Sequence, residues 1–145
     1  MVQVYVNYWA VIAAAIANMA LGFAWYGPMF GKWWSAWSGH SAEKIEAMKA
    51  QAQGGMWKTY ALAFIGSLLM AYVLRHSIVF AGAYLEITGA AAGLQAGFWS
   101  WLGFVAPVTL GTVLWEDKPW KLWILTNAYY LAALIVMGII VAVWA

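Results

Sequence analysis

Cysteine is absent from the 145-residue chain, and charged residues make up only 8% of it. Without cysteine the chain has no thiol nucleophile, no disulfide bond and no thiolate metal site. Soluble domains carry roughly 25% charged residues, so the low charge argues against a soluble globular domain. The formal net charge of +2 offers no support for nucleic-acid binding, and we expect no nucleic-acid partner.

Motifs that specify a reaction are also lacking. The chain has two histidines, His40 and His76, which form no His-x-x-x-His pair, and no glycine-rich phosphate loop occurs. We therefore predict no catalytic residue, no metal site and no cofactor, and we expect no enzymatic activity. Ligation of a haem or chlorophyll by His76 within a larger complex stays open, because one histidine specifies neither.

Long apolar stretches dominate what is present, since 66% of the residues are hydrophobic. Crossing a hydrocarbon core about 30 Å thick takes roughly 20 apolar helical residues. Four stretches reach that length, and none alternates as the strands of a membrane β-barrel do. We predict an all-α bundle of four transmembrane helices in one integral membrane domain, residues 1–145, with spans at residues 4–25, 56–80, 90–114 and 119–144 and a first connection at residues 26–55.

The basic residues predict the orientation of these spans, because lysine and arginine prefer the cytoplasmic side. Two connections contain or adjoin all six lysines, whereas the second connection has only Arg75. We predict a bacterial cytoplasmic (inner) membrane protein with both termini outside. The cytoplasmic lysines are then Lys32, Lys44, Lys49, Lys58, Lys118 and Lys121.

Aromatic residues gather at the predicted cytoplasmic ends of the spans. Eight of the twelve tryptophans fall there, and indole rings are favoured at the headgroup level of a membrane. We interpret this belt as a membrane anchor in contact with lipids, and a lipid- or ligand-binding aromatic pocket is the alternative. The interfacial candidates are Trp25, Tyr26, Lys32, Trp33, Trp34, Trp37, Trp57 and Trp120.

Polar residues inside the spans share one depth. Counted from the predicted cytoplasmic edge at 1.5 Å per residue, Asn18 and Asn127 lie roughly 10 to 12 Å inside the membrane. We predict a polar layer formed by Asn18, Ser67, Thr109, Asn127 and Tyr130. Its ordinary role is hydrogen bonding between helices, and the alternative is a substrate or ion site.

Three further features are predicted. Arg75 and Glu86 form an ion pair on the outer side. Ser41 begins a short amphipathic cytoplasmic helix that ends at Gly54-Gly55. Gly89, Gly93 and Gly97 make a smooth stripe that packs either inside the chain or between chains.

Similar segments also suggest an internal repeat. "MWKTYALAF" and "PWKLWILTN" each open a span after a cytoplasmic connection, and "GFAWYGP" is loosely echoed by "GFVAP". These similarities favour two repeated helical hairpins related by an axis along the membrane normal.

Four stretches that together cover almost the whole chain carry a family resemblance. They are "NYWAVIAAAIANMALGFAWYGPMFGKWW", "GGMWKTYALAFIGSLLMAYVL", "WLGFVAPVTL" and "KLWILTNAYYLAALIVMG". The chain resembles the domain of unknown function 1761 family of small bacterial membrane proteins, most specifically in Trp-Tyr-Gly-Pro followed by Phe-Gly-Lys. The resemblance implies a four-helix integral membrane protein, and it implies no activity, ligand or site residue.

Taken together, these features predict a non-enzymatic membrane protein that self-associates or serves as an accessory subunit of a membrane complex. Its expected partners are membrane lipids and either further copies of the chain or other membrane-protein subunits. The alternative is a small transporter or channel whose polar site lies in the cytoplasmic half of the bundle.

Overall fold

Residues 3–144 are described by a computed structural model, in which they form helices and connecting turns with no strand. The predicted all-α fold is therefore confirmed. The elements in chain order are α1 (Tyr8–Ala24), the π-helical segment η1 (Trp25–Met29), α2 (Gly31–Trp37), α3 (Ala42–Gly55), α4 (Trp57–Leu85), α5 (Gly89–Ser100), the π-helical segment η2 (Trp101–Val105), α6 (Ala106–Thr109), α7 (Gly111–Leu114) and α8 (Trp120–Val143).

Four helical stretches are long and apolar enough to cross a membrane: Tyr8–Met29, Trp57–Leu85, Gly89–Leu114 and Trp120–Val143. The first begins later than residue 4 because Asn7 caps it, accepting a hydrogen bond from the Trp9 backbone N–H at 3.1 Å. The second runs five residues past the predicted end at residue 80. It stops where Glu86 adopts a left-handed conformation with φ of 56°.

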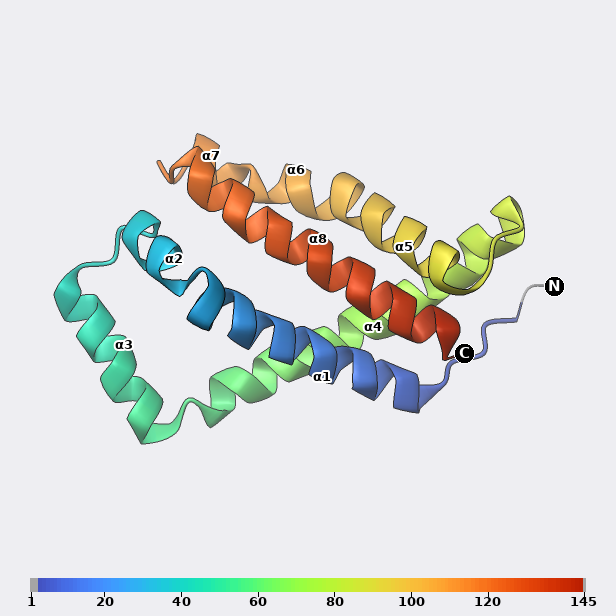
Figure 1. Cartoon of the computed structure of the whole chain (residues 1–145), viewed down its shortest axis with the longest axis horizontal. Helices are drawn as coiled ribbons and strands as arrows, with labels where there is room; N and C mark the ends of the chain where they lie inside the picture. Colours follow the sequence, from blue (N-terminus) through green and yellow to red (C-terminus); the bar gives the residue numbers. More distant parts are fainter. Residues whose placement is uncertain (1–2, 145) are drawn as a thin grey trace.

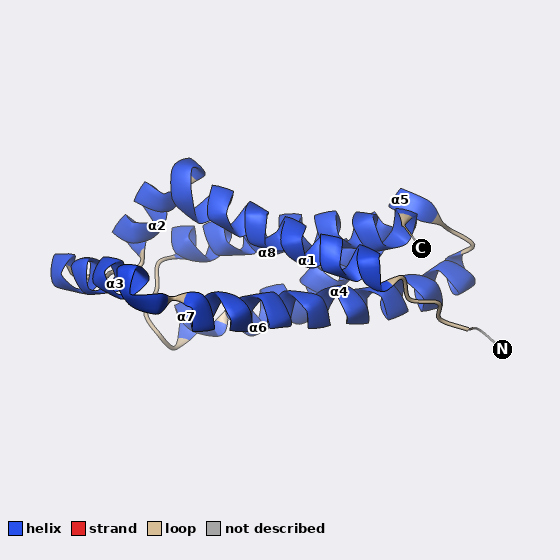
Figure 2. Ribbon diagram, turned by 90° about the horizontal axis from the view of Figure 1, so that it is seen from below, coloured by secondary structure: helices blue, strands red, loops and turns tan. Residues whose placement is uncertain are grey.

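Three spans run side by side, and the span formed by α4 crosses them obliquely (Figures 1 and 2). Figure 1 shows α8 between α1 and α5, with α4 crossing behind them. The short helices α2 and α3 lie at one end of the molecule, which we call the α2–α3 end. At the other end, which we call the terminal end, the Asn7 side chain donates to the Trp144 carbonyl at 3.0 Å.

The core relies on small residues that bring α5 and α8 close together. A Cβ atom added to Gly93 would overlap the backbone of Gly138, and one added to Gly97 would lie 2.6 Å from the Leu134 carbonyl oxygen. The glycine stripe therefore packs inside the chain, with one exception. Gly89 starts α5 with φ of 63° and has no neighbour within 4 Å of an added Cβ atom.

The first connection contains the short helix that Ser41 was expected to begin. The Ser41 hydroxyl accepts from the Lys44 backbone N–H at 3.2 Å, and an exposed pair joins Lys49 to Glu46 at 3.3 Å. No residue of α3 is buried, and the helix projects beyond the spans in Figure 1. α3 is thus held by its own caps and helical hydrogen bonds.

Both π-helical segments begin at a tryptophan and carry a glycine at the third position: Trp25 and Gly27 in η1, Trp101 and Gly103 in η2. Gly27 has non-helical backbone angles (φ −100°, ψ −106°) before Pro28, and the helix is broken there. η1 forms the end of the first span, whereas η2 lies near the middle of the third span, so the repeat of two hairpins stays a prediction.

Candidate functional site

The polar residues inside the spans form two hydrogen-bonded networks on opposite sides of α8. Asn127 and Tyr129 are two residues apart on this helix, which turns their side chains by roughly 200° relative to each other. Asn127 therefore faces η2 and α6, whereas Tyr129 faces α1. The single predicted layer is thus divided by its central helix.

The first network joins α1, α4 and α8. The Asn18 amide donates to the Ser67 hydroxyl at 2.8 Å, and that hydroxyl donates to the Ala63 carbonyl at 2.9 Å. The Tyr129 hydroxyl donates to the Asn18 side-chain oxygen at 2.9 Å. Asn18 and Ser67 are both buried, so the network fixes three spans where α1 meets α4.

The second network surrounds Asn127, which is 2% exposed. Its amide donates to the Thr109 hydroxyl at 2.9 Å and to the Trp123 carbonyl at 3.1 Å. Its side-chain oxygen accepts from the Trp101 indole N–H at 3.2 Å. The Trp123 indole N–H donates to Thr109 at 3.1 Å, so the polar groups of this cluster satisfy one another.

Tyr130 belongs to neither network through a described hydrogen bond. It packs against Tyr129 with ring centroids 5.5 Å apart and lines a small cleft of about 180 Å³ together with Thr109 and Asn127. The residues that sequence reasoning left out of the layer are Trp101 and Trp123. Trp123 had a usable signal, because it precedes Asn127 by four residues and so shares a helix face with it.

A larger cleft of about 500 Å³ opens between α1 and α4 toward the α2–α3 end. Asn18 and Tyr129 lie at its polar part, and aromatic rings provide much of its wall. Gly22 leaves room there, since an added Cβ atom would lie 3.2 Å from the Tyr129 hydroxyl. The aromatic lining residues are Phe23, Tyr26, Trp34, Tyr60 and Tyr129.

The predicted aromatic belt has an outward and an inward part. Trp33, Trp57 and Trp120 are exposed, at 55%, 67% and 55%, and Lys32 is exposed beside Trp33. Trp33 stacks on Trp37 at 5.8 Å, and the Lys121 amine lies 5.2 Å from the Trp37 ring centroid. The outward part suits a membrane interface, and lipid binding by these residues stays a prediction.

The inward part of the belt is half-buried. Trp25 packs on Phe30 and on Tyr129, with ring centroids 4.7 Å and 6.2 Å apart. Tyr26 packs edge-on against Tyr129 at 5.1 Å and against Trp34 at 6.0 Å. The buried Trp25 indole N–H has no hydrogen-bond partner among residues 3–144. These rings connect η1 and α2 to α8.

The predicted ion pair between Arg75 and Glu86 is wrong. Between residues 3 and 144, the one ion pair within 4.0 Å joins Lys49 and Glu46. Arg75 instead donates to the Tyr5 carbonyl at 2.9 Å and to the Val141 carbonyl at 3.4 Å. The reason is the length of α4: helix continues from Arg75 to Leu85 and separates Glu86 from Arg75 by roughly 16 Å along the axis.

The face formed by α4 and α5 on the side away from α8 was not predicted as a site. A cleft of about 200 Å³ there is lined by Gln95 and Ser100 of α5 and by Ser77 of α4. An adjoining cleft of about 510 Å³ is lined by Val73, Ser77, Ser100 and Phe104, among other apolar residues. The Gln95 amide takes part in no side-chain hydrogen bond within residues 3–144. Its signal in the sequence was a single amide in an otherwise apolar span.

Comparison with known families identifies the chain. Residues 9–142 match the family model described as a protein of unknown function, DUF1761. The chain belongs to the DUF1761 family. No curated protein and no solved structure matches it. The four long apolar helices of this DUF1761 protein are consistent with a membrane protein.

Proposed function

We propose that this DUF1761 protein is a non-enzymatic membrane subunit that associates with a second copy of itself through the α4–α5 face. The observation that carries the proposal is the unpaired Gln95 amide on that face. In a hydrocarbon medium, a polar group without a hydrogen bond costs about 2 to 7 kcal/mol, depending on the reference state. A neighbouring transmembrane helix is the usual source of the missing partner.

A glutamine amide is self-complementary, because it has both a carbonyl acceptor and an N–H donor. Two copies related by a twofold axis place the same patch opposite itself. Gln95 of one copy then donates to Gln95 of the other and accepts in return. This symmetry favours a second copy over an unrelated subunit.

The shape of the α4–α5 face also favours a second copy of the chain as the partner. Trp99 and Phe104 are 60% and 77% exposed, and they border the cleft that Ser77 and Ser100 line. A projecting aromatic side chain beside a concave surface allows two identical faces to interlock. The opposite side of α5 is unavailable, because Gly93 and Gly97 already pack against α8.

The alternative of a small transporter or channel receives no specific support. Asn18 and Asn127, which would line its pathway, use their amide groups in hydrogen bonds within the chain. A substrate would first have to break those bonds. We therefore propose one function only.

Cysteine cross-linking tests the interface, because the chain has no cysteine of its own. Ala91 is exposed one turn before Gln95 on the same face, and Ile12 is exposed near the terminal end of α1. In native membranes treated with oxidant, we expect Ala91→Cys to form a disulfide-linked dimer and Ile12→Cys to stay monomeric.

Three outcomes would overturn the proposal. If Ala91→Cys stays monomeric while it reacts freely with a thiol label, the face is not a contact between copies. If it links instead to a different protein, the chain is an accessory subunit of another complex. Equal dimer formation by Ile12→Cys would mean random collision.

A further inference from the structure

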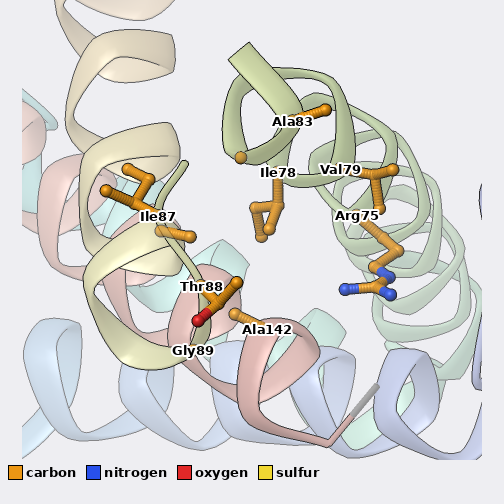
Figure 3. A pocket seen from close by; sticks show the side chains of 10 residues that line it. Arg75, Ile78, Val79, Ala83, Ile87, Thr88, Gly89 and Ala142 are labelled. Atoms are coloured by element: carbon orange, nitrogen blue, oxygen red, sulfur yellow. The ribbon is translucent and has the colours of Figure 1, made fainter. Parts of the chain in front are cut away.

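The one arginine of the chain, Arg75, lies in the wall of a cavity at the terminal end of the molecule. The cavity has a volume of about 360 Å³, and it lies between the end of α4, the start of α5 and the end of α8. Figure 3 shows the Arg75 guanidinium on one side and Thr88 with Gly89 across from it. Most other lining residues are apolar, as Ile78, Ile87 and Ala92 are.

The charge of Arg75 is solvated by the protein only in part. Its guanidinium has five N–H donors, and the carbonyls of Tyr5 and Val141 accept from two of its nitrogens. Carbonyl groups are neutral, so they leave the positive charge uncompensated. No carboxylate of residues 3–144 lies within 4.0 Å of it. A cation beside apolar side chains favours an anionic partner.

Thr88 lies on the opposite wall and precedes α5. In Figure 3 the carbon end of its side chain is directed toward Arg75, and its hydroxyl oxygen lies at the end away from Arg75. The guanidinium of Arg75 is therefore the donor that this cavity offers, and a guanidinium is suited to an oxygen anion.

The depth of Arg75 is given by the groups it binds. Tyr5 precedes α1, and Val141 lies in the last turn of α8, so the guanidinium is level with the ends of two spans. A headgroup would be found at this level, and acyl chains deeper in the membrane. Ile78, Ala92 and Ala142 line the cavity beside the arginine.

We infer that this cavity binds an amphipathic anion. Its carboxylate or phosphate lies against Arg75, and its hydrocarbon part lies against Ile78, Ile87 and Ala92. A free fatty acid and an anionic phospholipid share this chemistry. The inference is independent of self-association, because the cavity is lined by residues other than those of the Gln95 cleft.

Native mass spectrometry of the full chain in a neutral detergent tests the site. The probes are phosphatidylglycerol, palmitate and zwitterionic phosphatidylcholine, each titrated separately. We expect at least one anionic probe to bind about tenfold more tightly than phosphatidylcholine, since hydrogen bonds to a charged group contribute more than neutral ones. The anionic probe that binds more tightly identifies the source of the anion.

Matched variants locate the binding. Arg75→Gln removes the charge at the terminal end, and Lys58→Gln removes one charge at the α2–α3 end. We expect Arg75→Gln to lose about tenfold in affinity for the anionic probe and Lys58→Gln to keep it. The comparison of the three probes on the unmodified chain covers the case in which Arg75→Gln fails to fold.

The inference is overturned if the three probes bind alike, or if Arg75→Gln folds and keeps full preference for the anion. Equal loss in Lys58→Gln would also overturn it, because the binding would then follow net charge.

Discussion

Side-chain amides are hydrogen-bonded in the interior of the bundle, whereas the amide on the α4–α5 face has no hydrogen bond within the described chain. Inside, the amides of Asn18 and Asn127 are buried and hydrogen-bonded to neighbouring helices. On the α4–α5 face, the Gln95 amide lies at the surface without a hydrogen bond in the described chain. A satisfied amide holds a fold together, whereas an unsatisfied amide in an apolar span indicates a partner outside it.

The largest stability effect is expected from Asn127→Leu. Leucine has a similar size but no polar group, so the Trp101 indole N–H and the Thr109 hydroxyl lose their partner. We expect a loss of about 2 to 4 kcal/mol in the free energy of unfolding, measured by denaturant titration in detergent micelles.

Thr112→Val is the control for Asn127→Leu, because the Thr112 hydroxyl donates to the Thr109 carbonyl of a neighbouring turn at 2.8 Å. We expect it to cost less than about 0.5 kcal/mol. An equal effect of the two variants would show that the Asn127 network contributes nothing beyond local helix stability.

A smaller loss is expected from Tyr129→Phe, which removes the hydroxyl that donates to Asn18. The Asn18 amide keeps Ser67, so the expected loss is about 1 kcal/mol in the same titration. Tyr60→Phe serves as the control, since Tyr60 is 40% exposed. If Tyr129→Phe leaves stability unchanged, the oxygen of Asn18 has found another donor, such as water in the adjoining cleft.

The smallest effect on the single chain is expected from Gln95→Leu. Because no described contact is lost, the free energy of unfolding of the monomer should change by less than about 0.5 kcal/mol. The yield of the Ala91→Cys dimer in membranes should nevertheless fall about fivefold, as the loss of interhelical hydrogen bonds predicts. If Gln95→Leu destabilises the monomer as strongly as Asn127→Leu does, the Gln95 amide stabilises the fold, and the contrast between the interior and the α4–α5 face is wrong.

Sequence alone was sufficient for the spans, because length and apolar composition determine them. Depth arithmetic also placed Asn18 level with Ser67, which are hydrogen-bonded. It gave no information about the side of α8 on which each side chain lies. One layer was therefore predicted, although Asn127 and Tyr129 point to different sides of this helix. Distances along a chain predict height in a membrane, and only packing decides which face of a helix meets which neighbour.

The error at Arg75 has a similar cause. A predicted span ending at residue 80 brought Glu86 close, but α4 continues to Leu85, and nothing in the apolar run Ala81–Leu85 indicates where the helix should stop. The backbone carbonyls that Arg75 binds, those of Tyr5 and Val141, lie 70 and 66 residues away in the chain. Carbonyl acceptors occur at every residue, so no residue type marks them in advance.

The contacts of Arg75 link α4 to two other spans. The guanidinium binds the carbonyl of Tyr5, just before α1, and the carbonyl of Val141 in α8, while Asn7 binds the Trp144 carbonyl. Nearer the α2–α3 end, Asn18 of α1 binds Ser67 of α4, and the cleft between the two helices opens beyond this bond. The helices α1 and α4 are therefore joined at two levels, and the cleft lies outside the second.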